Sequence, residues 1–442
     1  MSRRRIREVE VAVTALGEDG LGEGQFEGRY VRIRNALPGE TVTARVLKRR
    51  AGALLAEAVE VRDRAPLRRA APCTVFPRCG GCSLQHLEHG AQLRHKEKVL
   101  LDALAANGVV PQSVRRPVSG PRLHYRHKAR LGVRCVGDNL LVGFRESFSS
   151  RVVRMADCRI LAEPLARCLP DLQSTLSSLR ERHRVPQVEL VAGDDSQAVI
   201  VRHLDPLGPE SQVRLEEMSR RLRMRVYLQA GGYDSLMLLG APGKRPKLTY
   251  SIMEFGVTYR FDVADFVQVN PAINRALASS VAVALDPRPG ITIADLFCGI
   301  GNFSLVLARH GAKVKGFEAS AGAIERAREN ADLNGLEHRC EFDVADLYDS
   351  GYAIPAGTQR LLLDPPRSGA GPHLARWLSG TELERVVYVS CNPMTFASDA
   401  AVFEKQGFAL IDVGVFDMFP QTAHVETLGV FVPSYSRTGA SR

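Results

Sequence analysis

The sequence lacks any long hydrophobic segment. No apolar run in its 442 residues approaches the length of about 18 that a membrane-spanning helix needs. The N-terminal stretch MSRRRIREVE is basic, but no apolar stretch follows it, so it does not form a secretory signal. No internal repeat is present. These absences exclude a helical membrane protein and a secreted one, and they predict a protein of the cytoplasm.

Positive charge is what the sequence has in excess. The net charge is +10, while apolar residues make up 45% and charged residues 24%, values ordinary for a globular protein. A basic surface can serve only to keep a protein in solution, or it can bind a polyanion. The length predicts roughly two to four domains, and the last residues, 435–442, are predicted to be a disordered tail.

The uneven distribution of this charge favours a polyanionic partner. Residues 115–154 hold ten Arg and Lys residues, Arg126 and Lys128 among them, against only Asp138 and Glu146. The aromatic residues of the same region are Tyr125, Phe144 and Phe148. Arginines mixed with aromatics suit phosphate contacts and base stacking, which is how unpaired RNA is usually held. We therefore predict an RNA-binding surface, in which neutralising Arg126 and Lys128 together would flatten the salt dependence of binding.

The pattern of elements divides the chain into three domains. Residues 1–62 contain short strand-like runs separated by turns, with 17–28 as one long turn, and suit a small closed β-barrel of the oligonucleotide-binding type. Residues 63–264 mix strands and helices in an α+β domain, whose helical segment at about 91–122 is expected to lie against the next domain. Residues 265–434 alternate strand and helix, which predicts a Rossmann-like α/β domain with a parallel, doubly wound sheet.

A glycine turn near the start of the third domain predicts a cofactor site. Gly299 and Gly301 have no Cβ, so the backbone there can approach a ligand closely. Glu318 closes the next strand, where a carboxylate can accept hydrogen bonds from both hydroxyls of a ribose. A dinucleotide site would have a third glycine where this chain has Ser304, so the shorter turn predicts S-adenosyl-L-methionine. The alternative is a tight turn without a ligand, which the position of Glu318 disfavours.

Two further features at strand ends bear on the chemistry. Asp346 ends the third predicted strand, where it can bind an adenine amino group or act as an ordinary strand cap. The fourth strand ends in LLLDPPRSG, in which Arg367 stands where enzymes that methylate exocyclic nitrogens place an aromatic residue. The sequence therefore argues against amino methylation.

Cys391, in VYVSCNP, is placed at the tip of a strand rather than in a core. Next to a methyl donor, a thiolate can add to C6 of uracil and turn C5 into a nucleophile, after which a base must remove the C5 proton. Such a scheme needs a cysteine of low pKa, in electropositive surroundings or desolvated beside the base. Glu426 is our candidate base and His424 the alternative, since both would point to one face if the strand already runs there. A charged strand edge is the other interpretation of Glu426.

With these residues assembled, the chain resembles the RNA uracil-5-methyltransferase family. The matching segments are DFVQVNP, DLFCGIGNFSL, the strand end at Glu318, LLLDPPRSG, VVYVSCNP and DMFPQTAHVET, which together span 265–431. The resemblance implies that Cys391 is the nucleophile and Glu426 the base. It also implies an S-adenosyl-L-methionine pocket lined by Gln268, Phe297, Asn302, Glu318, Asp346 and Asp364. Phe297 and Asn302 would otherwise be interpreted as a packing residue and a helix cap.

The remaining motif is a set of cysteines, Cys73, Cys79 and Cys82 in one loop and Cys158 far downstream. Their spacing alone does not separate an iron–sulfur cluster from structural zinc, since both accept four thiolates. A disulfide is disfavoured in a cytosolic chain. The resemblance implies a 4Fe-4S cluster, as in the bacterial ribosomal branch of the family, which would shape the RNA-binding surface.

The resemblance also bears on the target. The N-terminal barrel resembles a TRAM domain, an RNA-binding module, and a chain with both barrel and cluster resembles enzymes for a single uracil of 23S ribosomal RNA. We expect this RNA as the partner, before full ribosome assembly, with no membrane and no obligate protein partner. The alternatives are a dual-site 23S rRNA or a tRNA uracil-5-methyltransferase, and a non-catalytic RNA-binding assembly factor. A cytosine-5 enzyme is set aside, because Ser390 rather than proline precedes Cys391.

Overall fold

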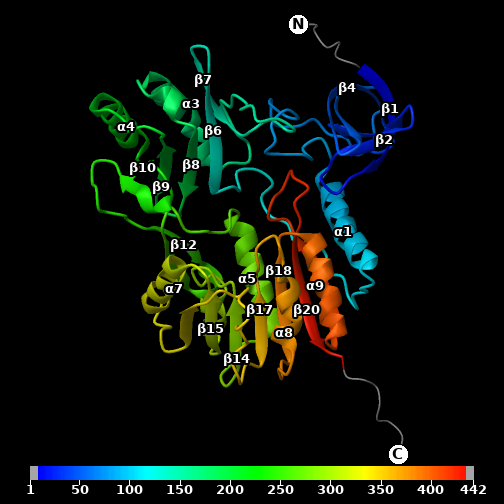
Figure 1. The fold of residues 1–442 in the computed structure, drawn as a ribbon, viewed down its shortest axis with the longest axis vertical. Helices are drawn as coiled ribbons and strands as arrows, with labels where there is room; N and C mark the ends of the chain where they lie inside the picture. Colours follow the sequence, from blue (N-terminus) through cyan, green and yellow to red (C-terminus); the bar gives the residue numbers. More distant parts are fainter. Residues whose placement is uncertain (1–7, 435–442) are drawn as a thin grey trace, which may run out of the picture.

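The N-terminal part of the chain forms a closed five-stranded barrel, drawn in blue in Figure 1. The computed structural model describes residues 8–434, so the predicted tail at 435–442 lies outside the described residues. The strands are β1 Glu8–Leu16, β2 Gly22–Phe26, β3 Arg29–Arg34, β4 Thr41–Arg50 and β5 Ala53–Val61. Side chains alternate along β1, with Val9, Val11 and Val13 inside the barrel.

Strand β2 corrects the expectation of one long turn at 17–28. Its glycines hid it from pattern reading, because strands are depleted in glycine. The structure shows why glycine is needed there, since a Cβ on Gly24 would lie 2.5 Å from the carbonyl oxygen of Ala12 in β1. The close approach of β1 and β2 thus lets the small barrel close.

The central part contains a six-stranded sheet in the order β11-β10-β9-β8-β6-β7. Its strands are β6 Lys128–Val136, β7 Asn139–Gly143, β8 Gln187–Ala192, β9 Gln197–Arg202, β10 Met224–Gln229 and β11 Leu236–Leu238. Its helices are α2 Glu163–Arg167, α3 Leu169–Ser178 and α4 Pro209–Leu222, and a hairpin of β12 Leu248–Ile252 and β13 Val257–Phe261 follows. The mixture of strands and helices is that of an α+β domain.

The C-terminal part is a seven-stranded sheet in the order β16-β15-β14-β17-β18-β20-β19. Its strands are β14 Thr292–Leu296, β15 Lys313–Glu318, β16 Cys340–Val344, β17 Arg360–Leu363, β18 Arg385–Ser390, β19 Phe408–Phe416 and β20 Glu426–Pro433. Strands β14 to β18 are parallel, as predicted, but β20 runs antiparallel to both of its neighbours. The reason is the short connection 417–425, because a parallel crossover needs a dozen or more residues.

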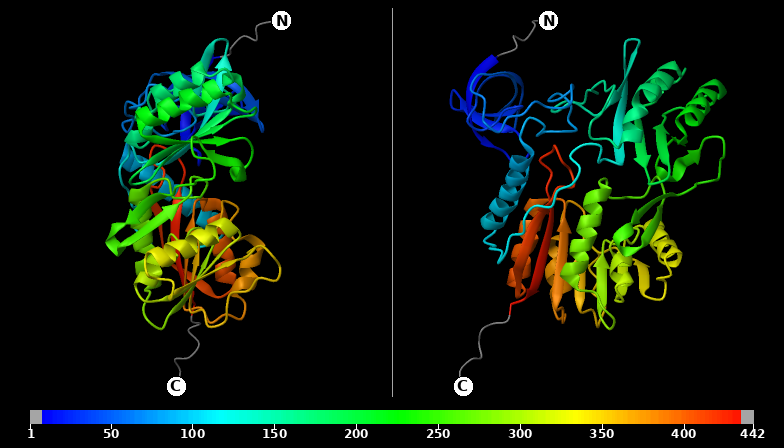
Figure 2. Two further views of the ribbon diagram at one scale, coloured as in Figure 1. Left: turned by 90° about the vertical axis from the view of Figure 1, so that its left-hand side faces the viewer. Right: turned by 180° about the vertical axis from the view of Figure 1, so that it is seen from behind.

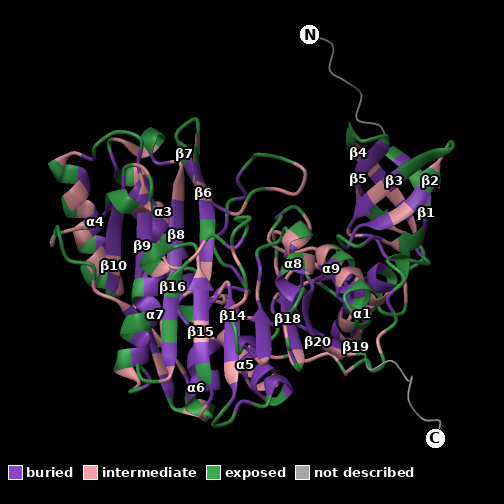
Figure 3. Ribbon diagram, turned by 60° about the horizontal axis from the view of Figure 1, so that its bottom comes forward, coloured by how far each residue is buried: buried purple, intermediate pink, exposed green. Residues whose placement is uncertain are grey.

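Helices cover both faces of this sheet, and one of them comes from far upstream. Helices α5 Pro271–Leu285, α6 Ser304–Arg309 and α7 Ala321–Leu333 share one core with the sheet. Helices α8 Leu374–Leu378 and α9 Pro393–Lys405 share the other with α1 His89–Ala106, seen beside α9 in Figure 2. The buried strand residues lie between these layers in Figure 3. Among residues 8–434, no helix is both long and apolar enough to cross a membrane.

After α1 the chain runs along the edge of the C-terminal sheet. The backbone amides of Gln112, Arg115 and Val118 donate to carbonyl oxygens of β19, at 3.0, 2.9 and 2.8 Å. This segment satisfies part of the exposed edge of β19, which would otherwise be open to pairing with another chain. Residues 112–118, which precede the central six-stranded sheet, are therefore built into the fold of the C-terminal domain.

Candidate active site

The predicted cofactor residues gather at the carboxyl ends of neighbouring parallel strands. Phe297, Gly299 and Gly301 follow β14 with φ angles of 66°, 54° and 86°, the left-handed region that glycine tolerates and phenylalanine rarely adopts. Glu318 ends β15, and Asp346 follows β16 as an exposed residue. Because β14, β15 and β16 are adjacent in the sheet, these residues lie along one edge, where ligands of open α/β sheets bind.

Asn302, which directly follows Gly301, anchors the glycine turn to the elements around it. The side chains of Asn302 and Asn274 of α5 donate to each other at 2.9 Å in both directions. The hydroxyl of Tyr250 donates to the side-chain oxygen Oδ1 of Asn302 at 2.9 Å, and the hydroxyl of Tyr259 donates to the backbone carbonyl oxygen of Asn302 at 2.7 Å. Asn302 therefore holds the turn against α5 and the β12–β13 hairpin, and it does not cap a helix.

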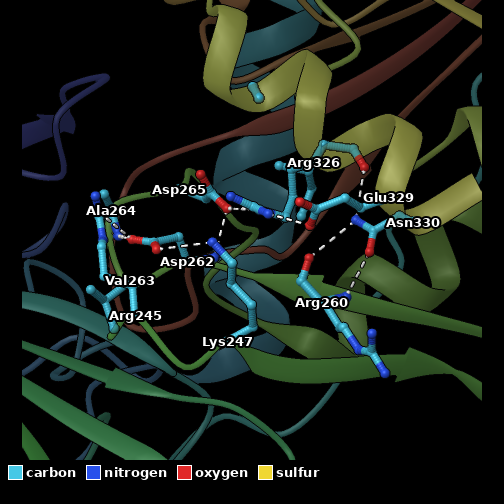
Figure 4. Close-up of polar contacts among 12 residues, drawn as sticks. Arg245, Lys247, Arg260, Asp262, Val263, Ala264, Asp265, Arg326, Glu329 and Asn330 are labelled. Atoms are coloured by element: carbon cyan, nitrogen blue, oxygen red, sulfur yellow. Dashed lines mark hydrogen bonds and ion pairs between the residues drawn. The ribbon is translucent and has the colours of Figure 1, made fainter. Parts of the chain in front are cut away.

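Gln268 lies on the loop that follows β13. Ion pairs clamp the first part of this loop, at Asp262 and Asp265, as Figure 4 shows. Asp262 accepts from Arg245 at 2.7 Å and from Lys247 at 3.2 Å. Asp265 pairs with Arg326 of α7 at 3.3 Å. The loop is thus held on one side by the residues before β12 and on the other by the helix that follows β15.

Lys128 holds the same loop and corrects part of the predicted RNA surface. Its Nζ donates to the carbonyl oxygens of Val263 at 2.9 Å and Asp265 at 2.7 Å, and it lies 3.5 Å from a carboxylate oxygen of Glu189. Its side chain is only 13% exposed, so the ammonium group is not available to a phosphate. The expectation that Lys128 contacts RNA is wrong, while Arg126 lies over the ring of Phe144, with its guanidinium carbon 5.6 Å from the centroid.

Cys391 stands at the strand tip, as expected, because the chain changes direction directly after it. The side chain of Asn392 caps α9 by accepting from the amide of Met394 at 3.1 Å, and Pro393 occupies the first helical position. Ser390 of β18 pairs with Thr427 of β20. That register places Cys391 across from Glu426, so the proposed nucleophile and base come from neighbouring strands.

Glu426 has the environment expected of a general base. It is only 3% exposed, and burial together with the charge of Asp364 raises its pKa to about 8, against the lowering effect of Arg367. Burial and the charge of Asp295 likewise raise the pKa of Asp364 to about 8. A carboxylate held so close to neutral pH can take up a proton at a modest cost.

The expected low pKa of Cys391 is not found. Burial raises the pKa of its thiol, and the negative charges of Glu426 and Asp364 act in the same direction. Arg367 is the group that lowers it, by its charge and by a hydrogen bond. The sequence gives Arg367 no role at the thiol beyond its argument against amino methylation, because nothing in the sequence shows that a residue after β17 lies beside the tip of β18.

His424 does not share a face of the strand with Glu426, because β20 begins only at Glu426. Its Nδ1 lies 2.9 Å from a guanidinium nitrogen of Arg367. Burial and the charge of Arg367 lower the pKa of His424 to about 4. The imidazole is therefore a weak base at neutral pH, which favours Glu426 over this alternative.

A single cleft joins the thiol to the other domains. It runs from Cys391 past the cysteine loop to the central domain and the barrel. Its lining includes Glu18, Gly81, Arg130, Phe144, Arg145, Phe148, Arg367, Cys391 and His424. Of the predicted RNA-binding residues, Arg130, Arg145, Phe144 and Phe148 therefore face the same space as Cys391, which suits an extended nucleic acid better than a small molecule. Tyr125 does not, because it is 2% exposed and its hydroxyl donates to the carbonyl oxygen of Pro420, so the expectation that its ring stacks on a base is wrong.

The four predicted metal-ligating cysteines line one cavity. Cys73, Cys79 and Cys82 meet Cys158 there, together with Phe144 and Met155. Burial raises the pKa of Cys79 to about 12 and raises that of Cys82 and Cys158 as well. Within residues 8–434, no group of His, Cys, Asp and Glu is arranged tightly enough to hold a single metal ion. None of the nine cysteines, all of which lie within the described residues, forms a disulfide.

Comparison with known proteins gives consistent matches along the chain. Residues 3–59 match the TRAM domain family, 287–353 a family described as methyltransferase domain, and 354–434 the family tRNA (Uracil-5-)-methyltransferase. The 23S rRNA (uracil(1939)-C(5))-methyltransferase RlmD of Hahella chejuensis is 41% identical, covering 98% of this chain and 99% of that protein. The enzyme of the same name from Azoarcus sp. (strain BH72) is 41% identical, covering 95% and 98%.

A solved structure shows the same fold. The tRNA (uracil-54, C5)-methyltransferase of Pyrococcus abyssi, in complex with S-adenosyl-L-homocysteine, superimposes with a TM-score of 0.75 and 24% identity. The match covers 96% of this chain and 99% of that one.

Proposed function

The chain belongs to the family of 23S rRNA (uracil-C5)-methyltransferases, and on that premise we propose that it methylates C5 of a uridine in 23S rRNA through Cys391 and Glu426. The observation that carries the proposal is the register of β18 and β20. It brings a thiol and a buried carboxylate of raised pKa together at the edge of the sheet that carries the cofactor turn.

The residues present fit S-adenosyl-L-methionine. The glycine turn leaves room for close backbone approach. The position of Glu318 at the end of the neighbouring strand β15 supports a role as acceptor for the ribose hydroxyls. Asp295 is fully buried, with one carboxylate oxygen accepting from Ser304 at 2.5 Å and the other, among the described residues, without a partner. When bound, the cofactor supplies an electrophilic methyl group.

The protein's own residues carry the remaining steps. The Cys391 thiolate attacks C6 of uracil, and the electron pair of the C5–C6 bond becomes a C5 enolate that can accept the methyl group. Glu426 then takes the C5 proton, the double bond re-forms, and the sulfur leaves C6 as a thiolate. Arg367 favours the charged thiolate, because the charge and the hydrogen bond of its guanidinium lower the pKa of Cys391.

The target is tested by methylating unmodified 23S rRNA with the purified chain and mapping 5-methyluridine in the product. We expect one product at the uridine equivalent to position 1939, the position in the relatives' name. Two methylated positions in 23S rRNA would identify a dual-site enzyme, and methylation of tRNA would identify a tRNA enzyme. The absence of product in both RNAs would identify a non-catalytic assembly factor. Protein-free RNA is expected to be a better substrate than assembled large subunits, which would place the reaction before full assembly, in the cytoplasm.

The four cysteines around one cavity further support a 4Fe-4S cluster held by Cys73, Cys79, Cys82 and Cys158. Thiolates are the ligands that such clusters take, and the cysteines come from two distant segments that a cluster would join. Anaerobically purified protein is expected to show visible charge-transfer absorbance with about four irons per chain, and Cys82→Ser is expected to lose it. Cys168→Ser is the matched control, since this buried cysteine lies outside the cavity. Stoichiometric zinc without colour would contradict the proposal.

A further inference from the structure

The segment that leads into Glu426, residues 417–425, is held mostly by residues from the N-terminal half of the chain. In Figure 1 it rises as a red loop above β20, against the cyan chain around α1. Lys96 of α1 donates to Asp417 at 2.6 Å and to the carbonyl oxygen of Phe419 at 3.0 Å. The ring of His89 lies 2.9 Å from the second oxygen of Asp417. Lys96 and Asp417 are 0% and 1% exposed, so this anchor is fully buried.

Gln421 is the centre of a second anchor. The side chain of Gln92 on α1 makes two bonds to Gln421. It donates to Oε1 of Gln421 at 3.1 Å and accepts from the backbone amide of Gln421 at 3.2 Å. The carbonyl oxygen of Gln421 accepts from the amides of Ser83 and Leu84, both at 3.0 Å. The φ angle of Gln421 is +67°, a conformation that costs a residue other than glycine about 1–2 kcal/mol and persists only where its surroundings fix it.

Two of the residues that hold Gln421, Ser83 and Leu84, follow the cysteine loop directly. Ser83 directly follows Cys82, and its hydroxyl also accepts from the amide of Ala423 at 3.0 Å. From Ala423 the chain needs only His424 and Val425 to reach Glu426. A displacement of the Cys82–Ser83 turn would therefore move the start of β20 through short, direct contacts.

We propose that Gln421 is a positioning residue that couples the cysteine site to the base Glu426. The inference rests on the proposed function, since it concerns the same base and the same cysteines. On this view the cysteine site does more than shape the RNA-binding surface, because its integrity sets the geometry of proton removal. Gln421 touches neither substrate nor cofactor in this account and acts only through the backbone of 421–426.

The test measures hydrogen exchange of the amides at 423–428 in the full-length protein. Cys82→Ser disturbs the cysteine site, and Gln421→Gly keeps the left-handed backbone available while it removes the amide pair with Gln92. Each variant alone is expected to speed exchange about tenfold, the equivalent of one lost hydrogen bond, which in Gln421→Gly is the bond from the Gln92 side chain to Oε1 of Gln421. Because both act on one coupled unit, the double variant is expected to show clearly less than the product of the two effects.

Two further variants sharpen the experiment. Gln212→Ala removes a side-chain bond to the carbonyl oxygen of Leu207 in the central domain and is the matched control, with unchanged exchange at 423–428. Ser83→Ala leaves all four cysteines in place, so it replaces Cys82→Ser if that variant does not fold. Multiplicative effects in the double variant, or unchanged exchange when the cysteine turn is altered, would overturn the proposal.

A kinetic readout separates positioning from simple stability. Gln421→Gly is expected to lower kcat about tenfold with KM for RNA unchanged, at a temperature where the protein stays folded. An unchanged kcat would mean that the contacts only stabilise the fold. The exchange experiment does not need catalysis, so it tests the coupling even if wild-type protein fails to methylate RNA.

Discussion

Replacing the base by its amide, Glu426→Gln, should stabilise the protein while it stops turnover. The carboxyl of Glu426 is buried, and its pKa is raised from 4.5 to about 8. A carboxyl group whose pKa is higher in the folded than in the unfolded protein stabilises the folded state fully only below its unfolded-state pKa. This stabilisation is lost as the pH rises through the folded-state pKa. Glutamine has no proton to lose in this range, so only the wild-type protein pays this cost.

The magnitude follows from the two pKa values. Each pH unit between them corresponds to about 1.4 kcal/mol, so the stability advantage of the variant should widen by roughly 3 kcal/mol from about pH 4.5 to about pH 7. Above about pH 8 the difference should level off. Constant effects of the substitution, such as the hydrogen bonding of the new amide, cancel in this comparison. The other carboxyl groups titrate in both proteins.

The chain offers a specific probe for this measurement. Its one tryptophan, Trp377, lies buried in α8 of the C-terminal domain, so tryptophan fluorescence during urea unfolding reports that domain. Glu404→Gln, an exposed site on α9, is the matched control and should show no pH-dependent difference. A stability difference that does not change with pH would refute the reasoning, because Glu426 would then titrate normally.

The same variant has a chemical signature. Glutamine cannot accept the C5 proton, so turnover should fall by a factor of about 10² to 10⁴. The RNA should remain attached to Cys391 after one methyl transfer, visible as a band that survives denaturation. Undiminished turnover would assign the base to another residue, with His424 the first to examine.

Several other outcomes are expected. In wild-type enzyme, C5 proton release should rise about tenfold per pH unit below the Glu426 pKa of about 8, because the base must be ionised; rapid quench across pH checks this. Arg367→Met should raise the Cys391 pKa and slow thiol alkylation at fixed pH, and equal alkylation rates would contradict it. Arg145→Gln, in the cleft, should reduce the salt slope of RNA binding by about 1. Lys128→Met should leave that slope unchanged but lower the unfolding temperature, because it breaks a buried clamp.

Much of the fold could be predicted from local sequence. The barrel, the α+β centre and the parallel strands β14 to β18 follow from periodicity and turn residues. Strand β2 was missed because its glycines serve a close contact with β1, which is a tertiary requirement. The antiparallel β20 was missed because strand direction depends on the length of the 417–425 connection, and the alternation of elements does not show it.

The site could be predicted only where a motif carries the chemistry. Cys391 and Glu426 stand in recognisable segments, and the four cysteines reach one cavity despite their separation in sequence. The roles of Arg367 and Lys128 could not be derived, because each depends on a partner brought close by another strand or domain. Composition made Lys128 a candidate RNA contact, whereas its burial against Val263 and Asp265 makes it a structural residue.

The most direct test of the central claim is tritium release from C5 of uridine-labelled 23S rRNA that lacks the modification. Wild-type protein and Cys391→Ala would be compared side by side with added S-adenosyl-L-methionine. We predict stoichiometric release with wild type and none with the variant, while both bind RNA equally. Release by the variant at the wild-type rate, or none by wild type on RNA that it binds, would contradict C5 chemistry through this thiol.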